Sequence, residues 1–188
     1  MNDPSKRAQH RHPCNARPPA ARKFSFAPVV DDRARVLILG TLPGGESLRK
    51  MQYYGHPQNQ FWRIVYGCFG KTPDDGYMAR LAFVQSKGIA IWDVLASAER
   101  NGSLDAAIKN GEANDFFQFL SRYSQITSIG FNGQKAQALF VRHAAANKNA
   151  MFTKINRTVL PSTSPAATRP YQEKIEVWRA FLNPVKPA

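Results

Sequence analysis

Four continuous apolar runs alternate along the chain with segments whose apolar residues recur at helical spacing. The runs are short enough for strands, and we expect each to be buried: Val36–Gly40, Ile89–Val94, Ile126–Phe131 and Thr158–Pro161. Strands that alternate with helices predict an α/β fold, in which a parallel sheet is covered by helices on both faces.

Five segments between and after these runs carry the helical pattern. The first has Phe61, Ile64, Val65 and Cys68, which fall on one face of a helix. The others follow or precede typical helix boundary signals, such as Asp115 or Gly88. We expect these four helices around residues 78–84, 116–120, 136–140 and 175–182.

The first 28 residues differ from the rest of the chain. They carry six Lys and Arg residues against Asp3 alone, several prolines and no apolar periodicity. We expect residues 1–28 to form a disordered basic tail and residues 29–188 a single domain. The tail is either a passive leader or an arm that increases nonspecific affinity for a phosphate backbone.

The formal net charge is +13 and the isoelectric point about 10.1. Such an excess indicates a polyanionic partner, either nucleic acid or an acidic membrane surface, unless it only keeps the protein soluble. No apolar run approaches the ~20 residues that span a bilayer, and the N-terminus lacks an apolar signal region. We favour nucleic acid over membrane as the partner, in the cytoplasm.

The two cysteines, Cys14 and Cys68, are far apart in the sequence. They cannot build a structural zinc site, an iron–sulfur cluster or a disulfide framework, so a reducing compartment fits. We expect neither a metal nor a cofactor.

Polar or small residues follow every predicted strand. Thr41 and the Gly44-Gly45 turn follow the first strand, Asp93 lies at the end of the second, and Asn132 follows the third. The fourth strand is followed by Ser162, Thr163 and Ser164. Because ligands of parallel sheets bind beyond the carboxyl ends of the strands, these residues predict one binding site.

The glycine-rich turn after the first strand does not bind a nucleoside triphosphate in the usual way. Glu46 stands where a P-loop needs lysine, and the turn lacks the dinucleotide-binding glycine pattern. An unrelated nucleotide hydrolase is therefore disfavoured. The turn is followed by Tyr53, Tyr54 and Asn59, which suit a pocket for a planar polar ring attached to a phosphate.

The stretch Gly40–Trp62 resembles the first motif region of the uracil-DNA glycosylase superfamily. Its ending, His56-Pro57-Gln58-Asn59-Gln60-Phe61-Trp62, is similar to that of the mismatch-specific uracil/thymine glycosylases. Ser162–Ala166 resembles the second motif of the superfamily, and Ile91–Val94 completes a combination most similar to the deoxyinosine (hypoxanthine) branch. The resemblance covers roughly residues 25–183 and implies a three-layer αβα fold with a central four-stranded parallel sheet.

The resemblance implies a catalytic role for Asn59. Most of the superfamily has Asp or Asn at the position of Leu42, where it handles the attacking water, and leucine cannot. The deoxyinosine branch is similar in lacking that group and implicates an Asn before the Phe-Trp pair, which here is Asn59. Asn59 could instead cap the helix that begins near Phe61.

The resemblance also implies residues that bind the base. Tyr54 would stack on the extruded base, while its neighbour Tyr53 turns into the core. Asp93 and backbone groups near Gly40 and Thr41 would read the edge of the base. Asp93 could instead cap the following turn.

Phosphates beside the extruded nucleotide would contact Gly44, Asn132, Ser162, Thr163 and Ser164 through hydroxyl and backbone N–H donors. Asn132 could instead cap a helix. His56 is expected to be structural, and Ala166 or Ala167 would fill the vacated position in the base stack.

The resemblance and the residues together predict a monofunctional DNA glycosylase that excises a deaminated base, hypoxanthine in first place, as a monomer associated with the nucleoid. Uracil opposite guanine, or xanthine, is the alternative substrate. A DNA-binding module with little activity is the alternative from another class, because Leu42 and Ser162 both weaken the catalytic set.

Overall fold

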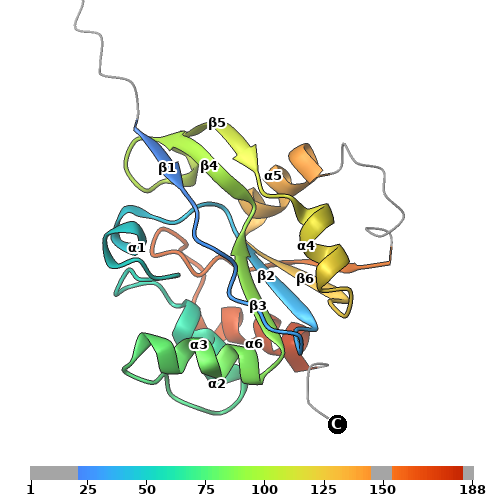
Figure 1. The fold of residues 1–188 in the computed structure, drawn as a ribbon. Helices are drawn as coiled ribbons and strands as arrows, with labels where there is room; N and C mark the ends of the chain where they lie inside the picture. Colours follow the sequence, from blue (N-terminus) through green and yellow to red (C-terminus); the bar gives the residue numbers. More distant parts are fainter. Residues whose placement is uncertain (1–20, 145–153, 184–188) are drawn as a thin grey trace, which may run out of the picture.

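A four-stranded parallel sheet lies at the centre of the structure, a computed structural model that describes residues 21–144 and 154–183 (Figure 1). Its strands are β2 (Val36–Gly40), β3 (Ile89–Asp93), β6 (Ser128–Asn132) and β7 (Asn156–Leu160). They lie in the order β3-β2-β6-β7, and all neighbours are parallel. The four predicted strands are confirmed, with boundaries that differ by at most two residues.

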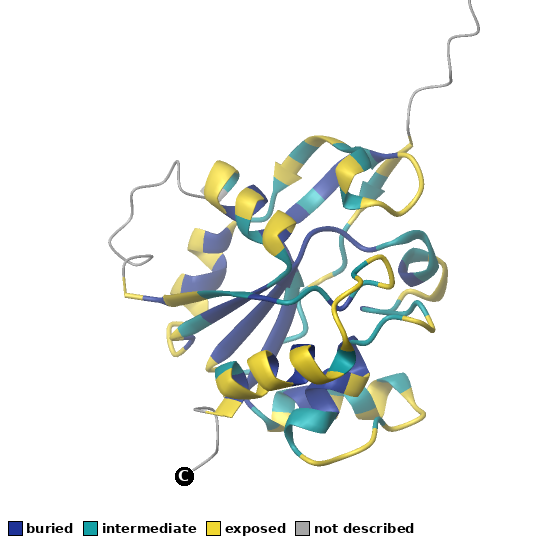
Figure 2. Cartoon of the chain, turned by 180° about the vertical axis from the view of Figure 1, so that it is seen from behind, coloured by how far each residue is buried: buried dark blue, intermediate teal, exposed yellow. Residues whose placement is uncertain are grey.

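Helices cover both faces of this sheet. Leu37 and Leu39 of β2 belong to a buried cluster with α4 (Phe116–Arg122) and α5 (Gln134–Ala144). Val36 and Ile38 belong to a second cluster, which the sheet shares with α2 (Phe61–Cys68), α3 (Tyr77–Ser86) and α6 (Tyr171–Leu182). Because alternate side chains of β2 enter opposite clusters, the strand is buried throughout (Figure 2). The predicted three-layer αβα fold and its five helices are confirmed.

A second sheet was not predicted. It consists of β1 (Arg22–Phe24), β4 (Leu95–Arg100) and β5 (Ile108–Ala113), in the antiparallel order β1-β4-β5. The chain enters β4 directly from β3, and the N–H groups of Val94 and Leu95 donate to the carbonyls of Gly40 and Thr41. The second sheet therefore extends from the carboxyl end of the parallel sheet (Figure 1).

Two further elements also escaped prediction, the helix α1 (Gly45–Lys50) and a 3₁₀ turn at Asp105–Ala107. The sequence of β4, LASAER, is rich in residues that favour helices, and it is held as a strand by pairing with β1. The strand thus depends on partners that are distant in the sequence.

Residues 22–28 belong to the domain, although the sequence assigned them to the tail. Arg22–Phe24 pair with β4, and the Ser25 hydroxyl donates to Asp93 Oδ2 at 2.7 Å. The Tyr53 hydroxyl donates to the carbonyls of Phe26 and Ala27, both at 3.2 Å. The predicted boundary at residue 28 is therefore wrong for this part, and residues 1–20 lie outside the described residues.

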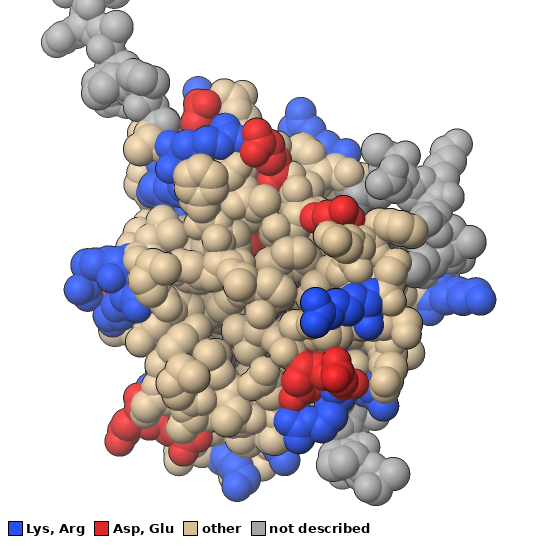
Figure 3. Space-filling model, in the orientation of Figure 1, with Lys and Arg blue, Asp and Glu red and all other residues tan. Residues whose placement is uncertain are grey.

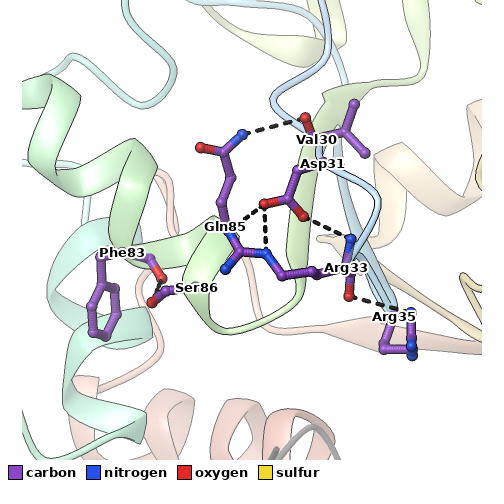
Figure 4. A network of polar contacts seen from close by, with 7 residues as sticks. All are labelled: Val30, Asp31, Arg33, Arg35, Phe83, Gln85 and Ser86. Carbon is purple, nitrogen blue, oxygen red and sulfur yellow. Dashed lines mark hydrogen bonds and ion pairs between the residues drawn. The ribbon is translucent and has the colours of Figure 1, made fainter.

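A small polar network fixes the entry of the chain into β2 (Figure 4). The Asp31 carboxylate accepts from the backbone N–H of Arg33 at 3.0 Å and from its guanidinium at 2.6 Å. Gln85 near the end of α3 donates to the Val30 carbonyl at 3.3 Å. Because exposed ion pairs contribute little free energy, the network shapes the turn more than it stabilises the fold.

Among the helices described at residues 21–144 and 154–183, none has the length and apolar character needed to cross a membrane.

We expect residues 21–28 to contribute measurably to stability. A variant that starts at Val29 loses β1, the Ser25 hydrogen bond and the edge contact between Phe26 and Tyr53. Its free energy of unfolding should be lower than that of a variant starting at Ala21 by about 2 kcal/mol or more. Urea denaturation measures the difference, and equal midpoints for the two variants would contradict it.

Candidate active site

A cavity of about 460 Å³ lies at the carboxyl ends of the parallel strands. Such volumes are typical of small-molecule sites. All ten predicted site residues line it: Gly40, Thr41, Gly44, Tyr54, Asn59, Asp93, Asn132, Ser162, Thr163 and Ser164. The sequence therefore predicted the position of the cavity, although the contacts of several individual residues differ from those expected.

Asp93 is the buried acidic group of this cavity. Its side chain lies against Gly40, where an added Cβ atom would come within 2.5 Å of Asp93 Oδ1, so a larger residue would displace the carboxylate. The carboxylate accepts from Ser25, 68 residues away, and not from the turn that follows it, so the predicted turn cap is not seen. Asp93 is 5% exposed.

Burial, and to a smaller extent the nearby Asp105, raise the pKa of Asp93, while Ser25 and Arg100 oppose the shift, and the resulting pKa is about 7. At neutral pH both protonation states of Asp93 are therefore populated. The anion can only accept hydrogen bonds, whereas the neutral acid offers one donor and one acceptor side by side.

Tyr54 lines the cavity. Phe61 covers one face of its ring, with ring centroids 3.6 Å apart and planes 12° apart. The backbone of Tyr54 has a positive φ of 54°, a conformation that a non-glycine residue adopts at a cost. A planar ligand can thus stack only on the uncovered face.

The hydroxyl of Tyr54 is buried and makes no hydrogen bond of normal geometry with the described residues. Burial and the charge of Asp93 raise the pKa of Tyr54, while Asn132 lowers it, so the phenol stays neutral. Tyr53 turns into the core and is 4% exposed, as predicted.

Asn59 lines the cavity, and its side chain accepts a hydrogen bond at the start of α2, where the N-cap residue is Gln60 and makes no side-chain cap bond. Asn59 Oδ1 accepts from the backbone N–H of Phe61 at 2.9 Å. This bond holds the amide in one orientation and leaves a second lone pair on Oδ1 for another donor. His56 Nδ1 accepts from the Gln58 N–H at 3.1 Å, so this nitrogen closes the local turn.

Thr163 and Asn132 bind each other. The Thr163 N–H donates to Asn132 Oδ1, and Asn132 Nδ2 donates to Thr163 Oγ1, both at 2.9 Å. The Thr163 carbonyl accepts from the N–H of Gln60 at 3.0 Å, and Thr163 is fully buried. The two residues fix the Ser162–Ser164 loop between β6 and α2. The Thr163 N–H is thereby engaged, whereas Asn132 Nδ2 keeps a second N–H donor.

Ser162 and Ser164 remain suited to a phosphate. Their hydroxyl oxygens accept from the N–H groups of Ser164 and Ala166, at 3.2 and 3.3 Å. The hydroxyl protons are left to donate outward.

Gly44 precedes α1, and its carbonyl accepts from Leu48 at 2.9 Å, so only its own N–H could serve a ligand. The carbonyls of Gly40 and Thr41 already accept from Val94 and Leu95. Each of these carbonyls keeps one lone pair, so a backbone contact to a base there could use a carbonyl or an N–H group.

The segment after β4 supplies site residues that the sequence analysis missed, namely Ser103, Leu104 and Asp105. Ser103 Oγ accepts from the Gly45 N–H at 3.0 Å, and Thr41 Oγ1 donates to Asp105 Oδ1 at 2.8 Å. The signal was the Asn101-Gly102 pair, which is typical of a reversing chain.

Arg100, the last residue of β4, is a buried cation behind the cavity. It donates to the carbonyls of Leu42 and Pro43 and lies 3.7 Å from Asp105 Oδ1. Leu42 lines the cavity but is 5% exposed and packs in the apolar cluster, and its side chain has no polar group to bind water.

Lys and Arg side chains lie mainly around the periphery of the face shown in Figure 3, and its centre is largely uncharged. In the described part of the chain, no three His, Cys, Asp or Glu side chains are grouped so as to hold a metal ion.

The comparisons with known proteins agree with this geometry. A sequence model of the Uracil DNA glycosylase superfamily matches residues 27–183, and the chain belongs to this superfamily. A hypoxanthine DNA glycosylase from Methanosarcina acetivorans is 36% identical over 162 residues, which is 86% of this chain and 98% of the relative. One from Methanosarcina barkeri is 39% identical over 116 residues, 61% of this chain and 73% of that relative.

A solved structure shows the same fold. The solution NMR structure of a candidate uracil DNA glycosylase from Methanosarcina acetivorans superposes with a TM-score of 0.74. The two chains are 34% identical, and the match covers 88% of this chain and 99% of the other.

The pKa of Asp93 predicts a specific pH dependence of stability. In the folded state this pKa is raised from 3.8 to about 7. The contribution of Asp93 to the free energy of unfolding is therefore fully present below about pH 4 and is lost as the pH rises through 7. Asp93→Asn, which can still accept from Ser25, should therefore gain stability relative to the parent protein between pH 4 and 8. The expected gain is about 1–4 kcal/mol, measured as the difference between two urea-denaturation series. Parallel pH profiles of the two proteins would contradict the assignment.

Proposed function

We propose that this protein is a monofunctional DNA glycosylase that removes hypoxanthine from deoxyinosine in DNA, as a first step of base excision repair. The observation that supports it best is the convergence of Tyr54, Asp93, Asn59 and the Ser162–Ser164 loop on one cavity. The similarity to hypoxanthine DNA glycosylases over most of the chain supports the choice of base.

The target nucleotide must leave the duplex, because the stack shields its glycosidic bond. Tyr54 would receive the base on its uncovered face, where stacking contributes ~1–3 kcal/mol. Hypoxanthine presents an N1–H donor beside an O6 acceptor. The neutral form of Asp93 matches this edge with two hydrogen bonds, and its raised pKa keeps that form populated near neutrality.

The bond cleavage would be largely dissociative, with positive charge on the sugar and negative charge on the leaving base. Preorganised dipoles stabilise such a charge distribution without rearranging. Asn59, held by Phe61, would orient the water with the second lone pair of Oδ1. The described residues that line the cavity include no lysine that could form a covalent adduct, which favours hydrolysis without strand cleavage.

We infer that the protein acts as a monomer and is associated with the nucleoid. A phosphate beside the extruded nucleotide would be bound by the hydroxyls of Ser162 and Ser164. Uracil is the second candidate base, because it also presents an N–H donor beside a carbonyl acceptor and because the superfamily and the solved relative carry its name.

A panel of duplexes tests the choice of base. Each carries one inosine, uracil or xanthine, and strand breaks are measured after alkali. We expect alkali-dependent breaks, fastest at inosine. If the protein binds DNA but forms no abasic product on any duplex, the alternative of a DNA-binding module with little activity would hold. Strand breaks before alkali would contradict the monofunctional mechanism.

Two substitutions separate the two roles of Asn59. Asn59→Ala removes both the cap and the amide and should lower the free energy of unfolding by about 0.5–2 kcal/mol. Asn59→Asp keeps an oxygen acceptor for the Phe61 N–H and should retain stability. Excision of hypoxanthine should fall strongly in Asn59→Ala. Parent-like rates in this variant would leave Asn59 as a cap alone.

A further inference from the structure

Leu42 occupies the position at which most of the superfamily has a polar residue that handles the attacking water. The cavity nevertheless contains carboxylates from other positions. Three of its described lining residues are acidic: Glu46, Asp93 and Asp105. Glu46 is paired with Arg49 at 2.7 Å and with Lys50 at 3.1 Å. Asp93 is almost completely buried and is engaged with Ser25. Asp105 differs from both, because 41% of its side chain is exposed and water can reach it.

Asp105 is also held in place from two sides. Thr41, the first residue after β2, donates to Oδ1 at 2.8 Å, and Thr41 itself is only 7% exposed. The guanidinium of Arg100, whose side chain is completely buried, lies 3.7 Å from the same oxygen. The other oxygen, Oδ2, makes no hydrogen bond or ion pair with the residues described at 21–144 and 154–183. One oxygen thus anchors the carboxylate, and the other is left for a ligand of the cavity that Asp105 lines.

We propose that Asp105 is a catalytic residue of this site and replaces, from the β4–β5 connection, the carboxylate that the position of Leu42 lacks. This proposal rests on the proposed glycosylase function. Oδ2 accepts a hydrogen bond from the attacking water, and the negative charge stabilises the cationic sugar.

The step balances as a hydrolysis. The glycosidic C1′–N bond breaks and its electron pair leaves with the base, while the oxygen of water bonds to C1′. The proton of that water passes to Asp105 Oδ2, and the base takes up a proton from solvent. Asp105 then releases its proton to solvent and returns to the carboxylate. Asn59 orients the same water, so the two residues divide orientation and proton transfer between them.

The surroundings of Asp105 fit a group that must take up a proton. Burial raises the pKa of Asp105, and the Thr41 hydroxyl and Arg100 limit the rise. The titratable groups that face it are Asp93 on β3, Arg100 on β4, Lys135 on α5 and the neutral Tyr54. The raised pKa makes the carboxylate a stronger base than an exposed aspartate.

Asp105→Asn tests the role directly, with single-turnover excision of hypoxanthine at saturating enzyme. We expect the rate to fall by about 10²–10⁴-fold, as for loss of a general base, with the DNA dissociation constant changed less than about threefold. In the pH–rate profile, the loss of rate at low pH that comes from protonation of Asp105 should disappear. The change of rate that comes from the titration of Asp93 should remain. The matched control is Glu112→Gln, which removes the same charge from the exposed side of β5 and should keep the parent rate.

A second variant guards against loss of folding, since Asp105→Asn leaves Arg100 without its ion pair. Thr41→Val keeps Asp105 but removes the hydroxyl that lowers its pKa, so the acidic limb should move to higher pH. A parent-like rate in folded Asp105→Asn, or an unmoved limb in Thr41→Val, would overturn the role of Asp105. Absence of excision by the parent protein would instead overturn the proposed function.

Discussion

One buried cation, Arg100, holds the active-site cavity together. Its side chain is fully buried, and a charge in that position is stabilised by pairing its donors, although Nε has no hydrogen-bond partner among the described residues. Two of its partners are the carbonyls of Leu42 and Pro43, in the turn that leaves β2. The third is Asp105, from the connection between β4 and β5. Because these contacts offset the burial of the charge, they hold the glycine-rich turn and this connection together.

The parallel sheet could be predicted because each of its strands, and each helix that covers it, shows a clear pattern within its own short segment of sequence. A strand such as Val36–Gly40 is apolar along its whole length, which is the pattern of burial on both faces, and the helices that cover it carry clear spacing. The cavity followed from the same pattern, since the ends of parallel strands meet at one edge.

The antiparallel sheet could not be predicted, because its stability comes from pairing between distant segments. Ala96, Ala98 and Glu99 of β4 favour helices in isolation, and their strand conformation depends on β1 and β5. This error also hid Arg100 and Asp105, whose importance is visible only once β4 lies beside the turn after β2. Ser25 was missed for the same reason, because its partner Asp93 is far away in the sequence.

Polar residues in the cavity fall into two groups that a motif does not separate. Asn132 and Thr163 hydrogen-bond to each other and so hold the loop, whereas the hydroxyl protons of Ser162 and Ser164 are left for a ligand. A sequence motif indicates that a residue is needed but not what it does. Only its hydrogen-bond partners show whether the residue supports a loop or is left to contact a substrate. Tyr54 shows the same division, with one face packed on Phe61, which leaves only the other for a ligand.

The hydrogen bond from Gln60 to the Thr163 carbonyl has a consequence for protein engineering. It couples the two motif regions, which are about a hundred positions apart in the sequence, through the backbone itself. A loop grafted from a relative into either region must therefore preserve the geometry of the other, and chimeras that exchange both regions as a unit are better designed than those that exchange one.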